Sequence, residues 1–109
     1  MIAERLSDDG FAVVEAEDGD QAVKQISTST PFSMLITDIQ MPGNADGNVV
    51  AQEAKAKSDL SIVYMTGNPS SLTQSLGPYD ALILKPFSPG ELMIIVQRLL
   101  SLRIGRSQL

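Results

Sequence analysis

The chain has 109 residues, of which 43% are apolar and 19% charged, and its net charge is −5, which suits one soluble domain with a single core. It contains no cysteine and no histidine, so disulfides, thiolate or histidine metal sites, cysteine nucleophiles and a phosphohistidine carrier are excluded. The acidic balance disfavours nucleic acid as a partner, and no apolar run is long enough to span a membrane. We therefore expect a cytoplasmic protein that contacts neither.

The first part of the chain predicts a helix, a strand and a second helix. Residues 2–9 have the pattern of the end of an amphipathic helix, and Gly10 follows as its C-terminal stop. Residues 11–16 are predicted to form a strand. Asp18 or Asp20 then caps a helix that ends in a stretch rich in serine and threonine.

The rest of the chain alternates in the same way, which predicts an α/β fold with a parallel sheet covered by helices on both faces. The expected elements are a strand ending at Asp38, a helix over about 48–57, a strand over 62–65, a weak helix over roughly 69–76, a strand over 81–84 and a helix over about 89–102. Ser88 is the expected N-cap of the last helix. Residues 103–109 are predicted to be a frayed tail, which places the domain at residues 1–102.

Polar residues stand where three of these strands end. Asp38 closes the apolar run 34–37, Thr66 follows 62–65, and Lys85 follows 81–84. The carboxyl ends of parallel strands meet at one edge of a sheet, which is where open α/β folds bind their ligands. A carboxylate, a hydroxyl and an ammonium at this edge suggest one site that handles a phosphoryl group.

Phosphoryl transfer mainly requires a nucleophile, accurate positioning and positive charge. Asp38 would be the acceptor and form an acyl phosphate, while Lys85 neutralises phosphoryl oxygens and Thr66 donates a hydrogen bond to them. A cis bond between Lys85 and Pro86 would direct the ammonium inward. Each residue alone also fits an ordinary turn or helix cap. The three together, in this order, favour the phosphoryl site.

Four segments resemble the receiver domain of bacterial two-component response regulators. They read FAVVEAEDGDQAV, MLITDIQMPGNADG, IVYMTG and ALILKPFSPGEL, and they cover nearly the whole chain. The resemblance implies a flavodoxin-like fold in which Asp38 accepts phosphate from a histidine kinase or a histidine phosphotransfer protein. It also implies that Thr66 and Lys85 sense the phosphoryl group, that Gln40 offers its backbone carbonyl to Mg²⁺, and that the signal passes to a downstream protein target.

The chain departs from that family at its start. Receivers begin with a strand that ends in two adjacent acidic residues, which hold the magnesium, and both the strand and the beginning of the first helix are missing here. Asp8 and Asp9 do not replace the pair, since they lie at the C-terminal end of a helix and no strand precedes them. Asp38 and one carbonyl are a thin ligand set for Mg²⁺, so phosphotransfer is expected to be weakened.

Three explanations of this departure stay open. Met1 is an internal methionine of a longer protein, or two chains pair or swap segments as a homodimer to cover the gap, or the chain is a natural truncated receiver that no longer takes phosphate. The missing strand would be central in the sheet, so its loss leaves unpaired backbone groups and an open hydrophobic face.

Two further features concern the output of the domain. Leu82 stands where the family often has an aromatic switch residue, so a hydroxyl contact is lost there. In the last helix, Met93, Ile94 and Leu100 widen the apolar surface beyond one stripe, which fits either a deeply covered helix or a face for a partner.

Three functions remain in competition. The favoured one is a non-enzymatic phosphorylation-dependent switch, and the first rival is a binding module with the same fold and no phosphate chemistry. The second rival is a small phosphatase with an aspartate nucleophile. Such enzymes usually have a second acid two residues after the first, where this chain has Gln40.

Overall fold

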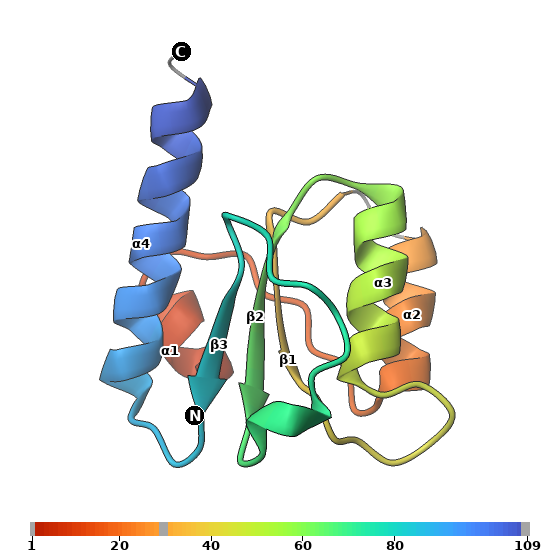
Figure 1. Ribbon diagram of the computed structural model, residues 1–109. Helices are drawn as coiled ribbons and strands as arrows, with labels where there is room; N and C mark the ends of the chain where they lie inside the picture. The colour runs from red at the N-terminus through yellow and green to blue at the C-terminus, as the bar shows by residue number, and fades with distance from the viewer. Residues whose placement is uncertain (1, 29–30, 108–109) are drawn as a thin grey trace.

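A computed structural model describes residues 2–28 and 31–107 and contains a parallel sheet (Figure 1). Its strands in the described residues are β1 Met34–Asp38, β2 Ser61–Thr66 and β3 Ala81–Leu84, and they lie side by side in that order. The predicted strands at 62–65 and 81–84 and the strand ending at Asp38 are thus confirmed in type and place. Both pairings are parallel, as predicted, although only β1 and β2 are joined through an α-helix, while β2 and β3 are joined by a short 3-10 turn and irregular chain.

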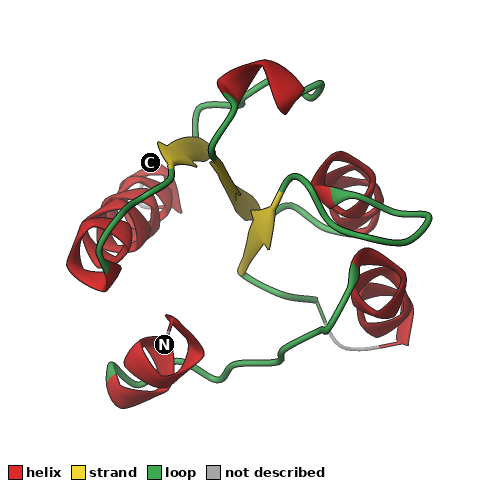
Figure 2. Ribbon diagram, turned by 90° about the horizontal axis from the view of Figure 1, so that it is seen from below, coloured by secondary structure: helices red, strands yellow, loops and turns green. Residues whose placement is uncertain are grey.

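Helices cover both faces of the sheet (Figure 2). The helices are α1 Ile2–Asp8, α2 Gly19–Thr28, α3 Gly47–Lys57 and α4 Pro89–Ser107, with a short 3-10 turn η1 at Pro69–Ser71. Helices α1 and α4 lie together on one face, and α2 and α3 lie together on the other (Figures 1 and 2). This is the layered architecture that the alternating pattern predicted.

The core lies on both sides of β2, in which every residue is buried. Such a strand reads as a continuous apolar run because both of its faces are covered. Val63 and Met65 pack with the α4 residues Leu92, Val96 and Leu99 on one face. On the opposite face Ile62 and Tyr64 pack with apolar residues of α3.

Local sequence signals set the helix boundaries. Asp18 caps α2, since its Oδ1 accepts a hydrogen bond of 2.8 Å from the Gln21 amide, and Ser88 caps α4 through the Glu91 amide at 3.1 Å. Gly10 ends α1 with a φ of 95°, a conformation that glycine adopts without strain. The predicted stop and caps therefore hold, with Asp18 rather than Asp20 as the cap of α2.

The predicted strand at residues 11–16 is wrong. The segment crosses from α1 to α2 without strand pairing, although Phe11 and Val13 pack against the core beside α4. A strand needs a neighbour to pair its backbone groups, and β1 lies across an intervening gap (Figure 2). The segment is apolar, as the prediction required, but no strand in the described residues pairs with its backbone.

Two other predictions need correction. The weak helix expected at 69–76 is only the single 3-10 turn η1, and the chain beyond it is irregular as far as β3. The tail expected to fray from residue 103 continues α4 to Ser107. Arg103 explains the extension, because its guanidinium donates to Ser61 Oγ at 2.7 Å and to Asp59 Oδ1 at 3.1 Å. Residues 108–109 of the predicted tail lie outside the described residues.

Asp80 fastens the amino-terminal edge of the sheet. Its side chain is almost fully buried and accepts hydrogen bonds from the amides of Ile62, at 3.0 Å, and Gly77, at 2.8 Å, while Lys55 forms an ion pair with it. Nearby, burial raises the pKa of Tyr64 to about 12, with a smaller contribution from the negative charge of Asp80. Asp80 therefore ties the approach to β3 to the start of β2.

The residues of α4 that were candidates for a partner face differ in their exposure to solvent. Met93 is buried in the core and Leu100 is half-buried against it, so Met93 does not belong to a free surface. Ile94 is 69% exposed and Leu102 46% exposed.

Among the described residues, no helix is both long enough and apolar enough to cross a membrane.

Candidate functional site

The three predicted site residues lie at the carboxyl edge of the sheet. Asp38 and Thr66 are the last residues of β1 and β2, and Lys85 directly follows β3. In the sheet register Asp38 lies opposite Met65, the residue before Thr66. The Lys85 amide donates to the Thr66 carbonyl at 2.8 Å, so the backbone joins the second and third positions directly.

Asp38 and Lys85 form an ion pair between Lys85 Nζ and Asp38 Oδ1. The side chains of Asp38 and Lys85 are 39% and 48% exposed, so the pair is open to solvent. The Oδ1 atom of Asp38 is buried and accepts no hydrogen bond from the described residues. The Lys85 ammonium is therefore the group that balances its negative charge. The peptide bond between Lys85 and Pro86 is cis, as expected from the sequence.

The hydroxyl of Thr66 is engaged within its own loop. It lies 3.1 Å from Asn68 O and 3.1 Å from Ser71 Oγ, and it accepts the Asn68 amide at 3.0 Å. This is the ordinary turn chemistry that a threonine before a Gly-Asn-Pro sequence also permits. The hydroxyl is therefore already occupied by partners in its own loop.

Asn48, which the sequence analysis missed, holds that loop in place. It lies in the first turn of α3 and is 93% buried, that is 7% exposed. Its Nδ2 donates to Ser71 O at 3.0 Å, and its Oδ1 accepts from the Thr73 amide at 2.9 Å. A buried polar side chain requires such partners. The sequence signal for this role was an asparagine directly before the apolar residues Val49 and Val50.

The loop after Asp38 folds back tightly onto the strand end. The Ile39 amide donates to Met65 O at 3.0 Å, and Ile39 O accepts from the Gly47 amide at 2.8 Å. A Cβ at Gly47 would lie 2.1 Å from Asp38 O, so only glycine fits where α3 begins. The cap of this helix is Asp46, which accepts from the Val49 amide at 3.1 Å. The position of Asp38 is thus set by backbone contacts.

The described residues do not form a magnesium site by themselves. No group of three or more aspartate, glutamate, histidine or cysteine side chains among them could hold a metal ion. Mg²⁺ requires near-octahedral oxygen ligands, whereas this edge offers Asp38, already paired with Lys85, and the backbone of the exposed Gln40. Leu82, at the expected switch position, is half-buried against the α3 side of the core.

Comparison with protein families matches residues 1–97 to the response regulator receiver domain. Among curated relatives, the probable transcriptional regulator ycf27 of Cyanidium caldarium is 34% identical over 92% of this chain and 41% of that protein. The transcriptional regulatory protein ResD of Bacillus subtilis is 31% identical over 87% of this chain and 40% of that protein. The chain therefore spans about two fifths of the curated relatives it matches.

Solved structures show the same architecture. A response regulator receiver protein from Sinorhizobium medicae is 25% identical with a TM-score of 0.81, over 92% of this chain and 82% of that one. The receiver domain of the sensor histidine kinase PA1611 from Pseudomonas aeruginosa, which has a magnesium ion in its active-site cleft, is 25% identical with a TM-score of 0.76, over 92% of this chain and 85% of that one. Because the family match covers most of the chain and the curated relatives and solved structures agree with it, the chain belongs to the response regulator receiver domain family.

Proposed function

We propose that the domain is a phosphoacceptor switch of a two-component phosphorelay and that Asp38 is the acceptor. The observation that carries this proposal is the contact between Lys85 Nζ and Asp38 Oδ1 at an exposed strand end. The ammonium lies beside the carboxylate, where it can pair with phosphoryl oxygens that arrive at Asp38.

The donor is a phosphohistidine of a histidine kinase or of a histidine phosphotransfer protein. A carboxylate oxygen of Asp38 attacks phosphorus, the phosphorus–nitrogen bond breaks, and its electron pair returns to the imidazole, which takes a proton from water. An acyl phosphate remains on Asp38. Lys85 then pairs with a phosphoryl oxygen, and Thr66 donates to another after its hydroxyl leaves Asn68 O and Ser71 Oγ.

The phosphorylated domain acts through protein contacts with a downstream target, in the cytoplasm. A membrane or nucleic-acid ligand has no part in this proposal, since the domain is acidic, with a net charge of −5. When the Thr66 hydroxyl leaves Ser71, the loop over residues 68–73 loses one of its contacts and can change conformation. Phosphorylation of Asp38 could in this way alter the surface of that loop.

A second candidate is a binding module with the receiver fold and no phosphate chemistry. The thin ligand set favours it, because no group of metal-binding side chains was found in the described part of the chain. In that case Lys85 and Asp38 form a permanent ion pair, and the carboxyl edge binds a partner without being modified.

Incubation with acetyl phosphate or phosphoramidate, with and without magnesium, followed by intact mass measurement, tests both candidates. The switch predicts addition of one phosphate, lost in Asp38→Asn and retained in Asp59→Asn, whose carboxylate lies at the other end of the sheet. Lys85→Gln should take up phosphate more slowly, because a charge near the transferred oxygens is gone. Complete absence of addition under every condition favours the binding module, and continuous release of inorganic phosphate would reveal a phosphatase instead.

A further inference from the structure

The hydroxyl of Thr66 uses its only hydrogen inside the loop that follows β2. A hydroxyl carries one hydrogen, so it can donate fully to one acceptor at a time. Ser71 Oγ donates to Asn68 O at 2.6 Å, which uses the hydrogen of Ser71. In its 3.1 Å contact with Ser71 Oγ, Thr66 is therefore the donor, and its other acceptor is Asn68 O, also at 3.1 Å. Since Thr66 is only 3% exposed, water competes little for this hydrogen.

Asn48 fixes the position of Ser71 relative to α3. Its Nδ2 donates to Ser71 O at 3.0 Å, and its Oδ1 accepts from the Thr73 amide at 2.9 Å. A buried amide side chain requires partners at both ends, and here both partners belong to the loop. The short turn η1, which contains Ser71, lies close to the start of α3 (Figure 1). The place of the Ser71 hydroxyl beside Thr66 is therefore set from α3.

The same contacts lead back to Asp38 from two directions. Asn48 directly follows Gly47, where a Cβ would lie 2.1 Å from Asp38 O. On the other side, the Lys85 amide donates to Thr66 O at 2.8 Å, and Lys85 Nζ forms the ion pair with Asp38. The members of this closed circuit are Asp38, Gly47, Asn48, Ser71, Thr66 and Lys85. A movement at the acceptor is thereby linked to the loop that holds the Thr66 hydroxyl.

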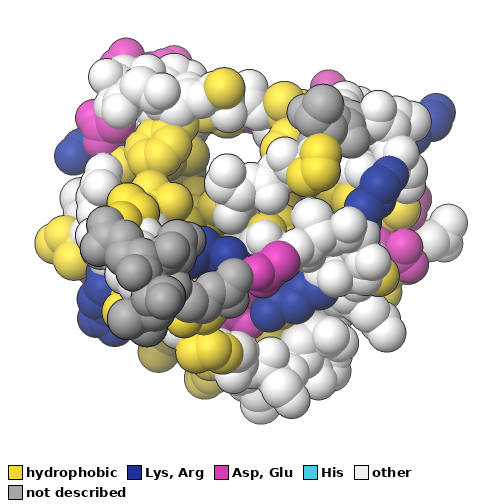
Figure 3. All heavy atoms as spheres, turned by 90° about the horizontal axis from the view of Figure 1, so that it is seen from above, with side chains coloured by type: hydrophobic (Ala, Val, Ile, Leu, Met, Phe, Trp, Pro, Cys, Tyr) yellow, Lys and Arg dark blue, Asp and Glu magenta, His cyan; other side chains and the backbone are white. Residues whose placement is uncertain are grey.

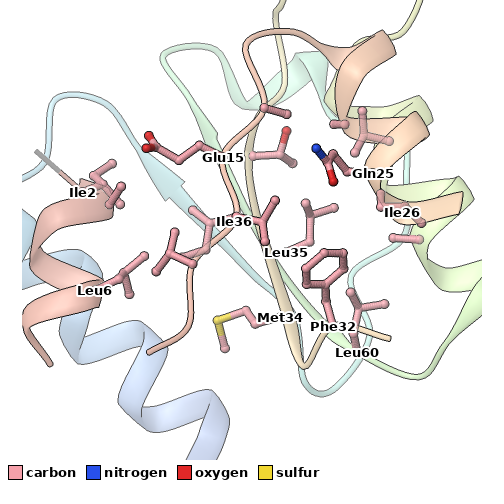
Figure 4. A pocket seen from close by; sticks show the side chains of 18 of the residues that line it. Ile2, Leu6, Glu15, Gln25, Ile26, Phe32, Met34, Leu35, Ile36 and Leu60 are labelled. Atoms are coloured by element: carbon pink, nitrogen blue, oxygen red, sulfur yellow. The ribbon is translucent and has the colours of Figure 1, made fainter. Parts of the chain in front are cut away.

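The circuit lies apart from the cavity that opens between β1 and residues 11–16 (Figure 4). This cavity has a volume of about 560 Å³, and Figure 3 shows it as a hollow rimmed by hydrophobic side chains on the face seen from above. Asp38 lines the cavity, whereas the loop residues Thr66 and Ser71 do not. Thr66 belongs to β2, which lies on the other side of β1 from the cavity (Figure 2). The loop therefore reaches the acceptor without involving the cavity.

We propose that Ser71 acts as a latch, which holds the Thr66 hydroxyl away from Asp38 in the unphosphorylated domain. Asn48 is the positioning residue that sets the strength of this latch. The role of the latch rests on the phosphoacceptor function proposed above, because Thr66 donates to an incoming phosphoryl oxygen only after its hydroxyl leaves Ser71. The latch therefore slows phosphoryl transfer to Asp38, and a domain without it takes up phosphate faster.

The rate of phosphate uptake from acetyl phosphate with magnesium, followed by intact mass, tests this role in the whole chain. Ser71→Ala should take up phosphate roughly two- to tenfold faster than the wild type, which is the worth of one net hydrogen bond. Asn48→Ala should also be faster, because the loop loses the side chain that holds it. Ser70→Ala is the matched control and should keep the wild-type rate, since its hydroxyl donates to Asn68 Oδ1 at 2.7 Å rather than to Thr66.

A double-mutant cycle distinguishes a latch from a general loosening of the loop. Thr66→Val replaces the hydroxyl with a methyl group, so Ser71→Ala should have no further effect on the uptake rate in that background. An equal acceleration in both backgrounds would overturn the proposal, since Ser71 would then act without the Thr66 hydroxyl. Unchanged or slower uptake in the Ser71→Ala single variant would overturn it as well.

The hydroxyl proton of Thr66 gives a readout that does not depend on phosphate. In the unphosphorylated wild type, NMR should detect slow exchange of this proton with water, and the exchange should be roughly tenfold faster in Ser71→Ala and in Asn48→Ala but not in Ser70→Ala. The same exchange rate in all four proteins would refute the latch. If none of them takes up phosphate, the phosphoacceptor function fails, and proton exchange still decides whether Ser71 holds Thr66.

Discussion

Replacement of Gly47 by alanine tests how rigidly the fold holds the acceptor. The new Cβ would lie 2.1 Å from Asp38 O and 2.7 Å from Ile39 Cα, about 1.3 Å and 0.7 Å short of ordinary contact at 3.4 Å. Both atoms belong to the backbone, so no side-chain rotation relieves the clash. The start of α3 or the end of β1 must move by about 1 Å.

Two magnitudes follow from this displacement. Overpacking against a rigid neighbour costs about 1–3 kcal/mol, partly offset by the better helix propensity of alanine, worth at most about 1 kcal/mol. A net loss of about 1–2 kcal/mol should lower Tm by roughly 5–15 °C. Since a misplacement of about 1 Å costs roughly 100-fold in rate, phosphate uptake from acetyl phosphate should fall by a similar factor.

Thermal unfolding followed by circular dichroism measures the first effect, and intact mass against time measures the second. Gly67→Ala is the matched control, because a Cβ there meets no atom within 4 Å although it adjoins Thr66. It should change the free energy of unfolding by less than about 0.5 kcal/mol. A Gly47→Ala protein with wild-type Tm would refute the steric argument. A destabilised protein with an unchanged uptake rate would refute the claim that this contact positions Asp38.

Three other predictions concern groups away from the acceptor. The raised pKa of Tyr64, about 12, means that the folded state keeps a proton that the unfolded chain loses near pH 10. Stability should therefore fall between about pH 10 and 12, by up to ~3 kcal/mol, and urea unfolding of Tyr64→Phe should lack this part of the decline. Asp80→Asn leaves a buried backbone amide with a weaker or missing acceptor and should cost about 2 kcal/mol, whereas the surface variant Asp59→Asn should cost under about 1 kcal/mol by the same thermal assay; equal losses would contradict the role given to Asp80. Asn48→Leu should leave α3 intact but speed amide exchange at Thr73 at least tenfold, and unchanged exchange there would show that the loop holds itself.

The sequence predicted what depends on local chemistry and on apolar pattern. The caps at Asp18 and Ser88, the stop at Gly10 and the strand at 62–65 each follow from residues close together in the chain. The same reasoning placed Asp38 and Lys85 at one edge, since strand ends of a parallel sheet converge.

The predictions that failed depend on contacts between residues far apart in the chain, which a local sequence pattern does not reveal. Residues 11–16 have the composition of a strand, yet strand formation depends on a neighbour elsewhere in the fold. The end of α4 continues because Arg103 reaches Ser61 and Asp59, more than 40 positions earlier in the chain. Asn48 was missed for the same reason, since its partners Ser71 and Thr73 lie 23 and 25 positions later.

The long connection from β2 to β3 is pinned at two points, and this determines where it can bend. Asn48 forms hydrogen bonds with its residues 71 and 73, and Asp80 forms one with Gly77. Only residues 74–76 lie between these two points of attachment. A displacement that starts at the carboxyl edge will therefore be absorbed in this short span, and the amino-terminal edge will be insulated from it.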